Sequence, residues 1–216
     1  MPGILDSSNT RGAAGRLSRL LTYALLAGVP VVTLYPLVWM LFGSLKSDAE
    51  FYTNIWGPPT VPIWQNYRDA WATGGIGRSF VNSLVVTGST VAIVLACTSL
   101  AAYAFATISF PGRNFLFYLL LISMMVPQAV LIIPTFTVIS QFGLVNTRLS
   151  LVLVYAAGQM GFGTFILRAY FLSLPRDLSA AALIDGCTHF GAFWRVMLPL
   201  ARPGLAAVLI FTSMAA

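Results

Sequence analysis

Five apolar runs alternate with polar segments along this chain. We interpret the first four as membrane spans and the last, of only 14 residues, as the start of a fifth, because a spanning helix needs about 20 residues. An apolar stretch bracketed by Pro127 and Pro134 favours a short re-entrant or interfacial helix after the third run. The pattern predicts an all-α fold, a polytopic transmembrane helical bundle. The five runs are residues 20–42, 80–106, 115–126, 149–167 and 203–216.

The amino-terminal residues divide into a polar tail and the first of these runs. Residues 1–15 are small and polar without an apolar period, which is typical of a disordered segment. Run 20–42 is too long for the core of a signal peptide and lacks a convincing cleavage site after it, so we expect it to remain as a membrane anchor. We therefore expect a disordered cytoplasmic tail over 1–15 and a transmembrane domain over 16–216.

Composition agrees with a membrane protein and argues against a nucleic-acid partner. Of 216 residues, 58% are apolar and 8% are charged, whereas soluble domains carry about 25% charged residues. The net charge of +6 comes from scattered Lys and Arg side chains without neighbouring stacking aromatics, so we expect no nucleic acid. Cys97 and Cys187 are expected to be free thiols.

The distribution of basic residues predicts the orientation in the membrane. With a cytoplasmic amino terminus, eight Lys and Arg residues fall inside and four outside, the bias that the positive-inside rule expects. The inside set is Arg11, Arg16, Arg19, Arg113, Arg168, Arg176, Arg195 and Arg202, and the outside set is Lys46, Arg68, Arg78 and Arg148.

Small residues recur on two of the runs, where they allow another helix to approach closely. They are Gly88, Ala92 and Ala96 in run 80–106, and Gly158, Gly161 and Gly163 in run 149–167.

Segment 168–202 begins with a predicted short helix. Pro175 suits a helix start, and the alanines at 180–182 are strong helix formers. Asp185 and Gly186 end this helix, since glycine readily adopts a left-handed backbone turn. The Asp185 side chain is interpreted as a helix-end capping group or as a contact to a partner protein, and both roles are compatible.

A second short helix is predicted from about His189 to Met197, with Thr188 as its cap and His189 in a helix-start role. Its large apolar side chains follow an i, i+3, i+4, i+7 spacing, and they either pack this segment onto the bundle or dock into a partner, where aromatic anchors dominate binding energy. These side chains are Phe190, Phe193, Trp194 and Met197.

Segment 168–202 resembles the cytoplasmic coupling loop of ABC-importer permeases, whose signature is Glu-Ala-Ala, three residues and Gly, followed by a helix and Leu-Pro. The matching positions are 180–182 and Gly186, with Leu198-Pro199 downstream. Ala180 stands where the family has Glu, which removes a charge expected to contact the ATPase subunit. The resemblance implies a set of ATPase-coupling residues: Ala180, Ala181, Ala182, Asp185, Gly186, Phe190, Phe193 and Trp194.

Further matches in order along the chain are similar to the carbohydrate-uptake branch, most of all to the second permease of maltose- or glycerol-phosphate-type importers. The resemblance implies an inner-membrane permease that translocates a sugar or sugar derivative, and about five of the family's six spans are present. A chain shortened at its carboxyl terminus is therefore expected. The matches are Pro62, 66–67, 103–105, 110–113, 125–127, 143–144 and 146–147.

The same resemblance implies the partners. They are a homologous second permease, a dimer of ABC ATPase subunits, an extracytoplasmic sugar-binding protein and the lipid membrane. The sequence lacks the phosphate-binding G-x-x-x-x-G-K-[ST] loop, so we expect ATP to be bound by a separate subunit and no cofactor in this chain.

Two polar side chains in run 149–167, Tyr155 and Gln159, are candidates for the substrate pathway, although hydrogen bonding to a neighbouring helix is the favoured interpretation. The three glycines of this run are interpreted as packing positions, or alternatively as loosening a span that lines the pathway. No metal site is expected.

The alternatives are a secondary transporter or channel and a membrane enzyme. Span interiors carry no clear Asp, Glu or Lys for ion coupling, and no nucleophile–base constellation supports catalysis. We therefore favour the importer subunit and expect no enzymatic activity in this chain.

Overall fold

The computed structural model describes residues 13–216, and every regular element in this range is a helix. The chain divides after Gly77 into two units, which are described separately. The predicted disordered tail lies outside the described residues except for its last positions, because α1 begins at Ala13.

Unit 1 contains α1 (Ala13–Ser44), α2 (Asp48–Thr53) and α3 (Gln65–Ala72). Within α1, Ser18–Ser44 has a mean hydropathy of 2.0 and is long enough to cross a membrane, which confirms the first predicted span. Its side chains are exposed almost all round, as expected of a helix whose neighbour is lipid.

Hydrogen bonds that involve side chains hold the segment from the end of α1 to the first turn of α3, here called the Lys46 loop (residues 45–66). The Asn66 amide donates to Ser44 O at 3.0 Å and to Lys46 O at 2.9 Å, and the buried Lys46 ammonium donates to Asn54 O. Thr60 donates to the Glu50 carboxylate through its backbone N–H (2.7 Å) and its hydroxyl (2.9 Å). This loop is therefore an ordered element that its own side chains stabilise.

Unit 2 contains the remaining spans. α4 (Ile76–Thr107) crosses the boundary between the units, and α7 (Arg148–Ser173) extends beyond the run 149–167 from which it was predicted. α5 (Arg113–Met125) and α6 (Gln128–Gln141) meet at a bend of 103°, which agrees with the predicted break at Pro127. The described chain has three helices able to span a membrane, or up to five if each bent pair counts as one span.

The carboxyl-terminal part of unit 2 consists of α8 (Arg176–Ile184), α9 (His189–Ala192), a π-helical turn η2 (Phe193–Met197), α10 (Leu198–Leu200) and α11 (Arg202–Ala215). We call the continuous stretch 189–200 the coupling helix, after the coupling loop that segment 168–202 resembles. It meets α11 at a bend of 77°. The sequence predicts that this helix ends at Pro199, but in the structure it continues to Leu200 and Ala201 is its carboxyl-terminal cap.

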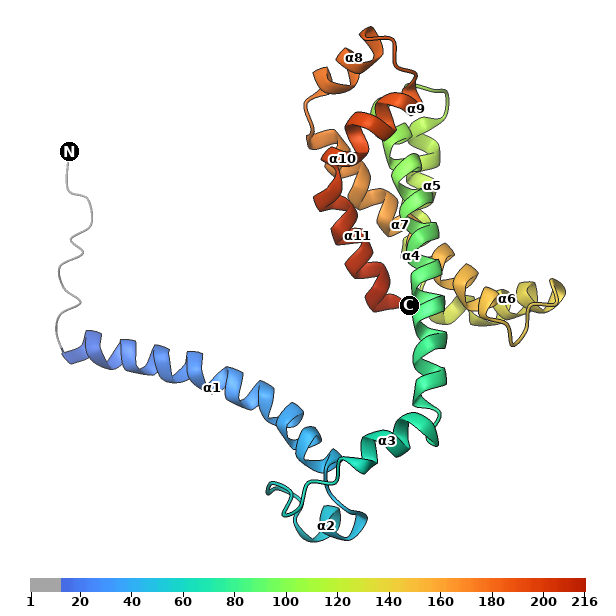
Figure 1. Cartoon of the computed structure of the whole chain (residues 1–216). Coiled ribbons are helices and arrows are strands. Elements are labelled where there is room, and N and C mark those ends of the chain that lie inside the picture. The colour runs from blue at the N-terminus through green and yellow to red at the C-terminus, as the bar shows by residue number, and fades with distance from the viewer. Residues whose placement is uncertain (1–12) are drawn as a thin grey trace. The chain divides into compact units, whose positions relative to one another are not determined.

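The core of unit 2 forms where α4, α7, α11 and the coupling helix meet (Figure 1). On α7, a Cβ atom at Gly161 would lie 2.6 Å from Met124 Cγ of α5, and one at Gly163 would lie 3.0 Å from Thr98 Cγ2 of α4. The packing role predicted for the glycines of α7 is therefore confirmed at both positions. The core residues are Val94, Ala102, Tyr103, Ala156, Leu167, Phe171, Phe193, Met197, Ala201 and Val208.

The small residues of α4 behave differently from those of α7. Gly88, Ala92 and Ala96 are all exposed, and nothing in the described chain lies within 4 Å of a Cβ placed on Gly88. The close helix approach that this spacing permits is thus not made by the described part of the chain.

Candidate functional site: the coupling loop

The first helix of the coupling loop, α8, ends at the predicted turn. Gly186 has φ +85°, a left-handed conformation that an L side chain rarely adopts. The backbone N–H groups of Asp185 and Cys187 donate to the carbonyls of Ala181 (2.9 Å) and Ala182 (3.0 Å), which closes the carboxyl-terminal turn of α8. Gly186 therefore sets the direction in which the chain leaves α8.

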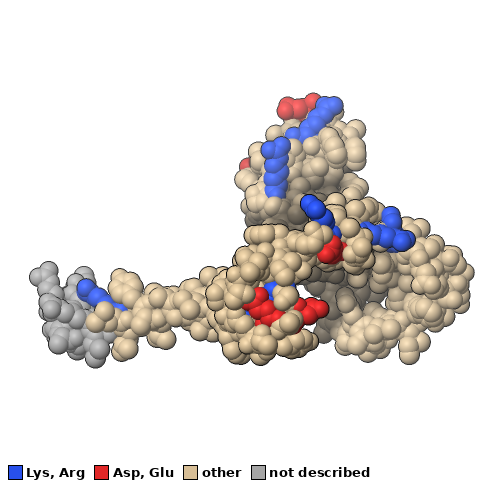
Figure 2. Space-filling view, turned by 60° about the horizontal axis from the view of Figure 1, so that its bottom comes forward, with Lys and Arg blue, Asp and Glu red and all other residues tan. Residues whose placement is uncertain are grey.

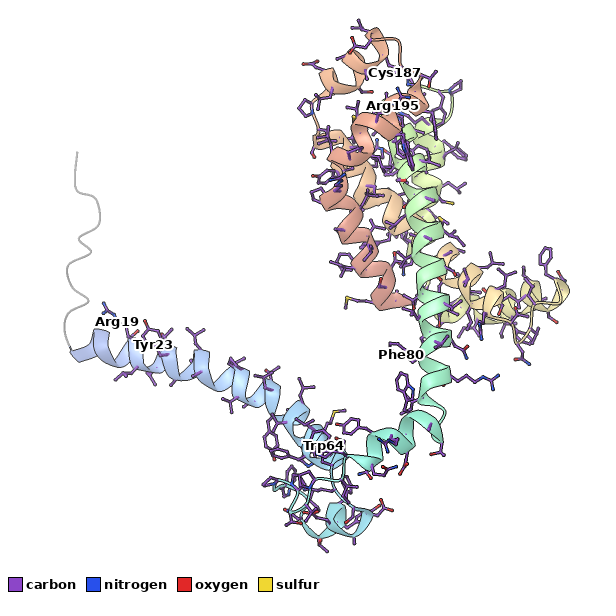
Figure 3. All side chains as sticks on the ribbon, viewed as in Figure 1. Arg19, Tyr23, Trp64, Phe80, Cys187 and Arg195 are labelled. Carbon is purple, nitrogen blue, oxygen red and sulfur yellow. The ribbon has the colours of Figure 1, made fainter. Side chains whose placement is uncertain are left out.

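The coupling helix begins as its sequence predicts. Thr188 is its amino-terminal cap, and its hydroxyl oxygen accepts a hydrogen bond from the Gly191 N–H at 3.2 Å. His189 is the first residue of the helix and is exposed, in the helix-start position expected for it. Figure 3 shows Cys187, just before this helix, and Arg195, within it, at the end of unit 2 that α8 and α9 form.

The predicted aromatic stripe of this helix is split between two environments. Phe193 and Met197 are each 2% exposed and belong to the core of unit 2. Phe190 is 63% exposed and Trp194 is 60% exposed, and their rings stack with centroids 6.5 Å apart and an interplanar angle of 16°. The packing interpretation is therefore confirmed for Phe193 and Met197. Docking of Phe190 and Trp194 into a partner stays a prediction.

The buried edge rests on aromatic side chains from other helices. The Phe193 ring lies 5.3 Å from the Tyr103 ring of α4, and Tyr103 lies 6.0 Å from Phe171 of α7. Tyr103 and Phe171 are 3% and 2% exposed. The Phe193 contact attaches the coupling helix to α4, and Tyr103 in turn contacts α7. Neither Tyr103 nor Phe171 has a local sequence signal that singles it out for this role.

The motif positions on α8 present a mostly open surface. Ala180, Ala181, Asp185 and Gly186 are exposed, and Ala182 is 7% exposed. Asp185 is the carboxyl-terminal cap residue of α8. An exposed side chain at a helix end remains compatible with a cap and with a partner contact.

The candidate pathway residues Tyr155 and Gln159 lie in the middle of α7 and are half-buried. The structure does not bring them together with the coupling loop. The Gln128 amide nitrogen lies 3.4 Å from a Cβ placed on Gly158, so a second amide approaches this part of α7. The sequence analysis did not single out Gln128, because its proximity depends on the bend between α5 and α6.

On the face shown in Figure 2, Lys, Arg, Asp and Glu cover a small part of the surface, and some acidic side chains lie beside basic ones. Within residues 13–216, no group of three or more His, Cys, Asp or Glu side chains could hold a metal ion.

Comparison with known proteins identifies the class. Residues 98–216 match the family described as "Binding-protein-dependent transport system inner membrane component". The crystal structure of a bacterial ABC transporter involved in the import of the acidic polysaccharide alginate superposes with a TM-score of 0.85. The sequence identity is 22%, and the match covers 94% of this chain and 72% of the alginate importer chain. This likeness shows that the two chains share a fold.

Curated relatives agree with this family. The chain is 40% identical over 205 residues to the diacetylchitobiose uptake system permease protein NgcG of Streptomyces coelicolor, covering 95% of this chain and 66% of NgcG. It is 35% identical over 199 residues to the arabinooligosaccharides transport system permease protein AraQ of Halalkalibacterium halodurans, and the match covers 90% of this chain and 70% of AraQ. The chain spans somewhat less than two thirds of NgcG, and 59% of the probable ABC transporter permease protein YurM of Bacillus subtilis. It belongs to the family of binding-protein-dependent transport system inner membrane components.

Proposed function

We propose that this chain is a membrane-spanning permease subunit of an ABC importer that translocates a sugar or sugar derivative across the inner membrane. ATP is hydrolysed by a partner subunit in this proposal. The relatives NgcG and AraQ, both named for the uptake of oligosaccharides, support the substrate class. The positive-inside bias supports a cytoplasmic amino terminus and a cytoplasmic coupling loop.

One observation carries the coupling role. The stacked pair Phe190 and Trp194 is exposed on a helix whose other edge, at Phe193, is fixed in the core. Large exposed aromatic side chains on a rigid support are typical of binding hot spots. The ATPase subunit is the partner that the family architecture supplies, and the pair would enter a groove on its surface.

In the proposed mechanism, this chain and a homologous permease form the pathway, and a soluble binding protein delivers the sugar. Closure of two ATPase subunits on ATP displaces the coupling helix, and the buried contacts of Phe193 transmit the movement to α4 and α7. ATP drives alternating access only because it binds the two states of the complex with different affinities. Tyr155 and Gln159 are proposed to face the pathway, at the shared interface with the second permease.

The experiment is co-purification of the tagged full chain in mild detergent from cells that carry its transport partners. Recovery of an ATPase and a second permease, with loss of the ATPase when residues 176–199 are scrambled, would support the proposal. A well-folded chain recovered alone would contradict it and favour a self-sufficient transporter.

Gly186→Pro provides a sharper test of coupling. Proline has no backbone N–H, fixes φ near −65° and is therefore incompatible with the left-handed turn at this position. We expect the protein to remain in the membrane while ATP hydrolysis becomes uncoupled from uptake. The matched control is Gly88→Ala on α4, where nothing in the described chain is within 4 Å of the added atom. Normal uptake with Gly186→Pro would remove the coupling assignment.

A further inference from the structure

One arginine of α7, Arg168, contacts two other helices of unit 2. Its guanidinium carbon lies 4.1 Å from the centroid of the Phe117 ring in α5, and its Nε donates a hydrogen bond to Phe105 O in α4 at 3.3 Å. Phe105 and Phe117 are 9% and 7% exposed, so both contacts lie at the edge of the packed interior. A single side chain thus joins three helices.

Arg168 donates to a carbonyl at the carboxyl-terminal end of α4, where carbonyls lack a backbone N–H partner within the helix. Phe105 lies in the last turn of α4, which ends at Thr107, and the last four carbonyls of an α-helix have no intrahelical donor. This helix end also carries the negative end of the macrodipole, which favours a cation. Arg113 adds a second contact beyond the helix end, from Nη1 to Ile108 O at 3.4 Å. The guanidinium of Arg168 therefore satisfies both the hydrogen bonding and the charge at the end of α4.

An arginine is suited to these two contacts together in a way that lysine is not. Its planar guanidinium stacks on an aromatic face while an edge N–H donates in the plane, whereas an ammonium is a compact, strongly hydrated charge. The side chain can therefore keep the Phe117 ring and the Phe105 carbonyl at a fixed separation.

Arg168 is also adjacent to the anchor of the coupling helix. Its neighbour Leu167 is fully buried, and Phe171 lies one turn further along α7. Phe171 contacts Tyr103, which in turn contacts Phe193 of the coupling helix. The contacts of Arg168 and the anchor of the coupling helix thus occupy neighbouring turns of α4 and α7.

We propose that Arg168 is a positioning residue that clamps the carboxyl-terminal end of α4 and the adjoining α5 to α7, so that these ends move with the coupling helix as one unit. The movement itself rests on the proposed function, whereas the clamp does not. Without this clamp, a displacement of the coupling helix would reach α4 through Tyr103, while the carboxyl-terminal part of α7 and the first turns of α5 would follow it less closely.

The test measures the distance between the turn after α4 and the end of α7. Spin labels are attached to cysteines introduced at Ser109 and Ser173, both exposed, in the full chain with Cys97 and Cys187 replaced by Ser. Pulsed electron paramagnetic resonance then records the distance distribution in lipid nanodiscs. It is measured for the chain alone and for its complex with the ATPase, in ADP and in ATP with vanadate.

We expect one narrow distribution that does not change with nucleotide, and a broadened distribution for Arg168→Met. Arg168→Lys keeps the charge and should restore part of the narrowing, a rescue that a generally damaged fold would not show. Arg148→Met is the matched control, since it removes an exposed arginine from the other end of the same helix. It should leave the distribution unchanged.

Several results would overturn the clamp. They are an unchanged distribution in Arg168→Met, an equal broadening in Arg148→Met, or a nucleotide-dependent distance in the unsubstituted chain. If Arg168→Met does not fold, Phe117→Leu removes the ring and keeps the arginine, and it should also broaden the distribution. Broadening in a chain that binds no ATPase would support the clamp and contradict the proposed function, so the two failures are distinguishable.

Discussion

The Lys46 loop of unit 1 leads from α1 to α3, and the coupling helix of unit 2 leads from α8 to α11, but different forces hold the two segments. The Lys46 loop is held by hydrogen bonds, with Asn66, Lys46 and Glu50 all bonded within the loop or to its first residues. The coupling helix is attached by two buried apolar side chains, Phe193 and Met197.

The difference teaches how each segment can be used. Hydrogen bonds are directional, so a loop stabilised by several of them has a defined conformation of its own. Apolar packing is less directional, so a helix anchored by one edge keeps its other edge available to a partner. The Lys46 loop is stabilised by its own hydrogen bonds, whereas the coupling helix is held by one edge and exposes the other edge to a partner.

The strongest way to break this comparison is to remove the apolar anchor. Phe193→Ala should lower the free energy of unfolding by about 3–5 kcal/mol, because it removes a buried ring and leaves a cavity. The matched control is Phe190→Ala on the open edge of the same helix, with an expected change within about 0.5 kcal/mol. Denaturant unfolding in detergent micelles measures both variants. Equal losses would show that the two edges are not different.

On the exposed edge of the coupling helix, a substitution should weaken partner binding and leave the free energy of unfolding nearly unchanged. Trp194→Ala should weaken binding of the ATPase subunit by about 2 kcal/mol, roughly 30-fold, because a central aromatic contact is lost. Its stability should change by no more than about 0.5 kcal/mol. Titration of the ATPase onto immobilised permease measures the affinity, and Phe136→Ala, an exposed aromatic of α6, is the control. An unchanged affinity would contradict the docking role of the pair.

The corresponding change in the Lys46 loop is Asn66→Ala. It removes the donor to Ser44 O and Lys46 O, and we expect a loss of about 1–3 kcal/mol in local stability because both carbonyls lose their partner. Hydrogen exchange of peptides covering 44–66 measures the loss. Gln65→Ala is the neighbouring control, since Gln65 bonds Asp69 within α3 at 2.7 Å and is exposed, with an expected effect of about 0.2–0.5 kcal/mol. Similar protection from hydrogen exchange in Asn66→Ala and Gln65→Ala would contradict the conclusion that the Asn66 hydrogen bonds stabilise the Lys46 loop.

The smallest expected effect is a pH dependence confined to the Lys46 loop. The hydrogen bond from the Thr60 backbone N–H is the main cause that lowers the pKa of Glu50 below its ordinary value of 4.5. A lowered pKa in the folded state means that the stabilisation is present above pH 4.5 and is lost as the pH falls through the lowered pKa.

Glu50→Gln removes this ionisation and keeps a side-chain acceptor for Thr60. The ratio of hydrogen exchange between the two proteins, followed over peptides covering 48–60 as the pH is lowered, should therefore change below pH 4.5, while exchange in the coupling helix stays parallel. A constant ratio in the loop would remove the role of the Glu50 charge.

Short-range features of this protein could be predicted from its sequence. The break near Pro127, the left-handed turn at Gly186 and the cap at Thr188 follow from residue types within a few positions of each other, and the long spans follow from uninterrupted apolar runs. Local sterics and helix propensity decide such features, and these act within one or two helical turns.

Only the tertiary structure decided how these elements are used. The spacing of the coupling helix placed Phe190, Phe193 and Trp194 on one stripe, but the Tyr103 and Phe171 rings of other helices determined which edge is buried. Arg168 counted as one more cytoplasmic charge in the sequence, and it acquired its role from a carbonyl 63 positions away. The physical reason is that burial and interhelical contacts depend on which helices meet, and no pattern within a single helix contains that information.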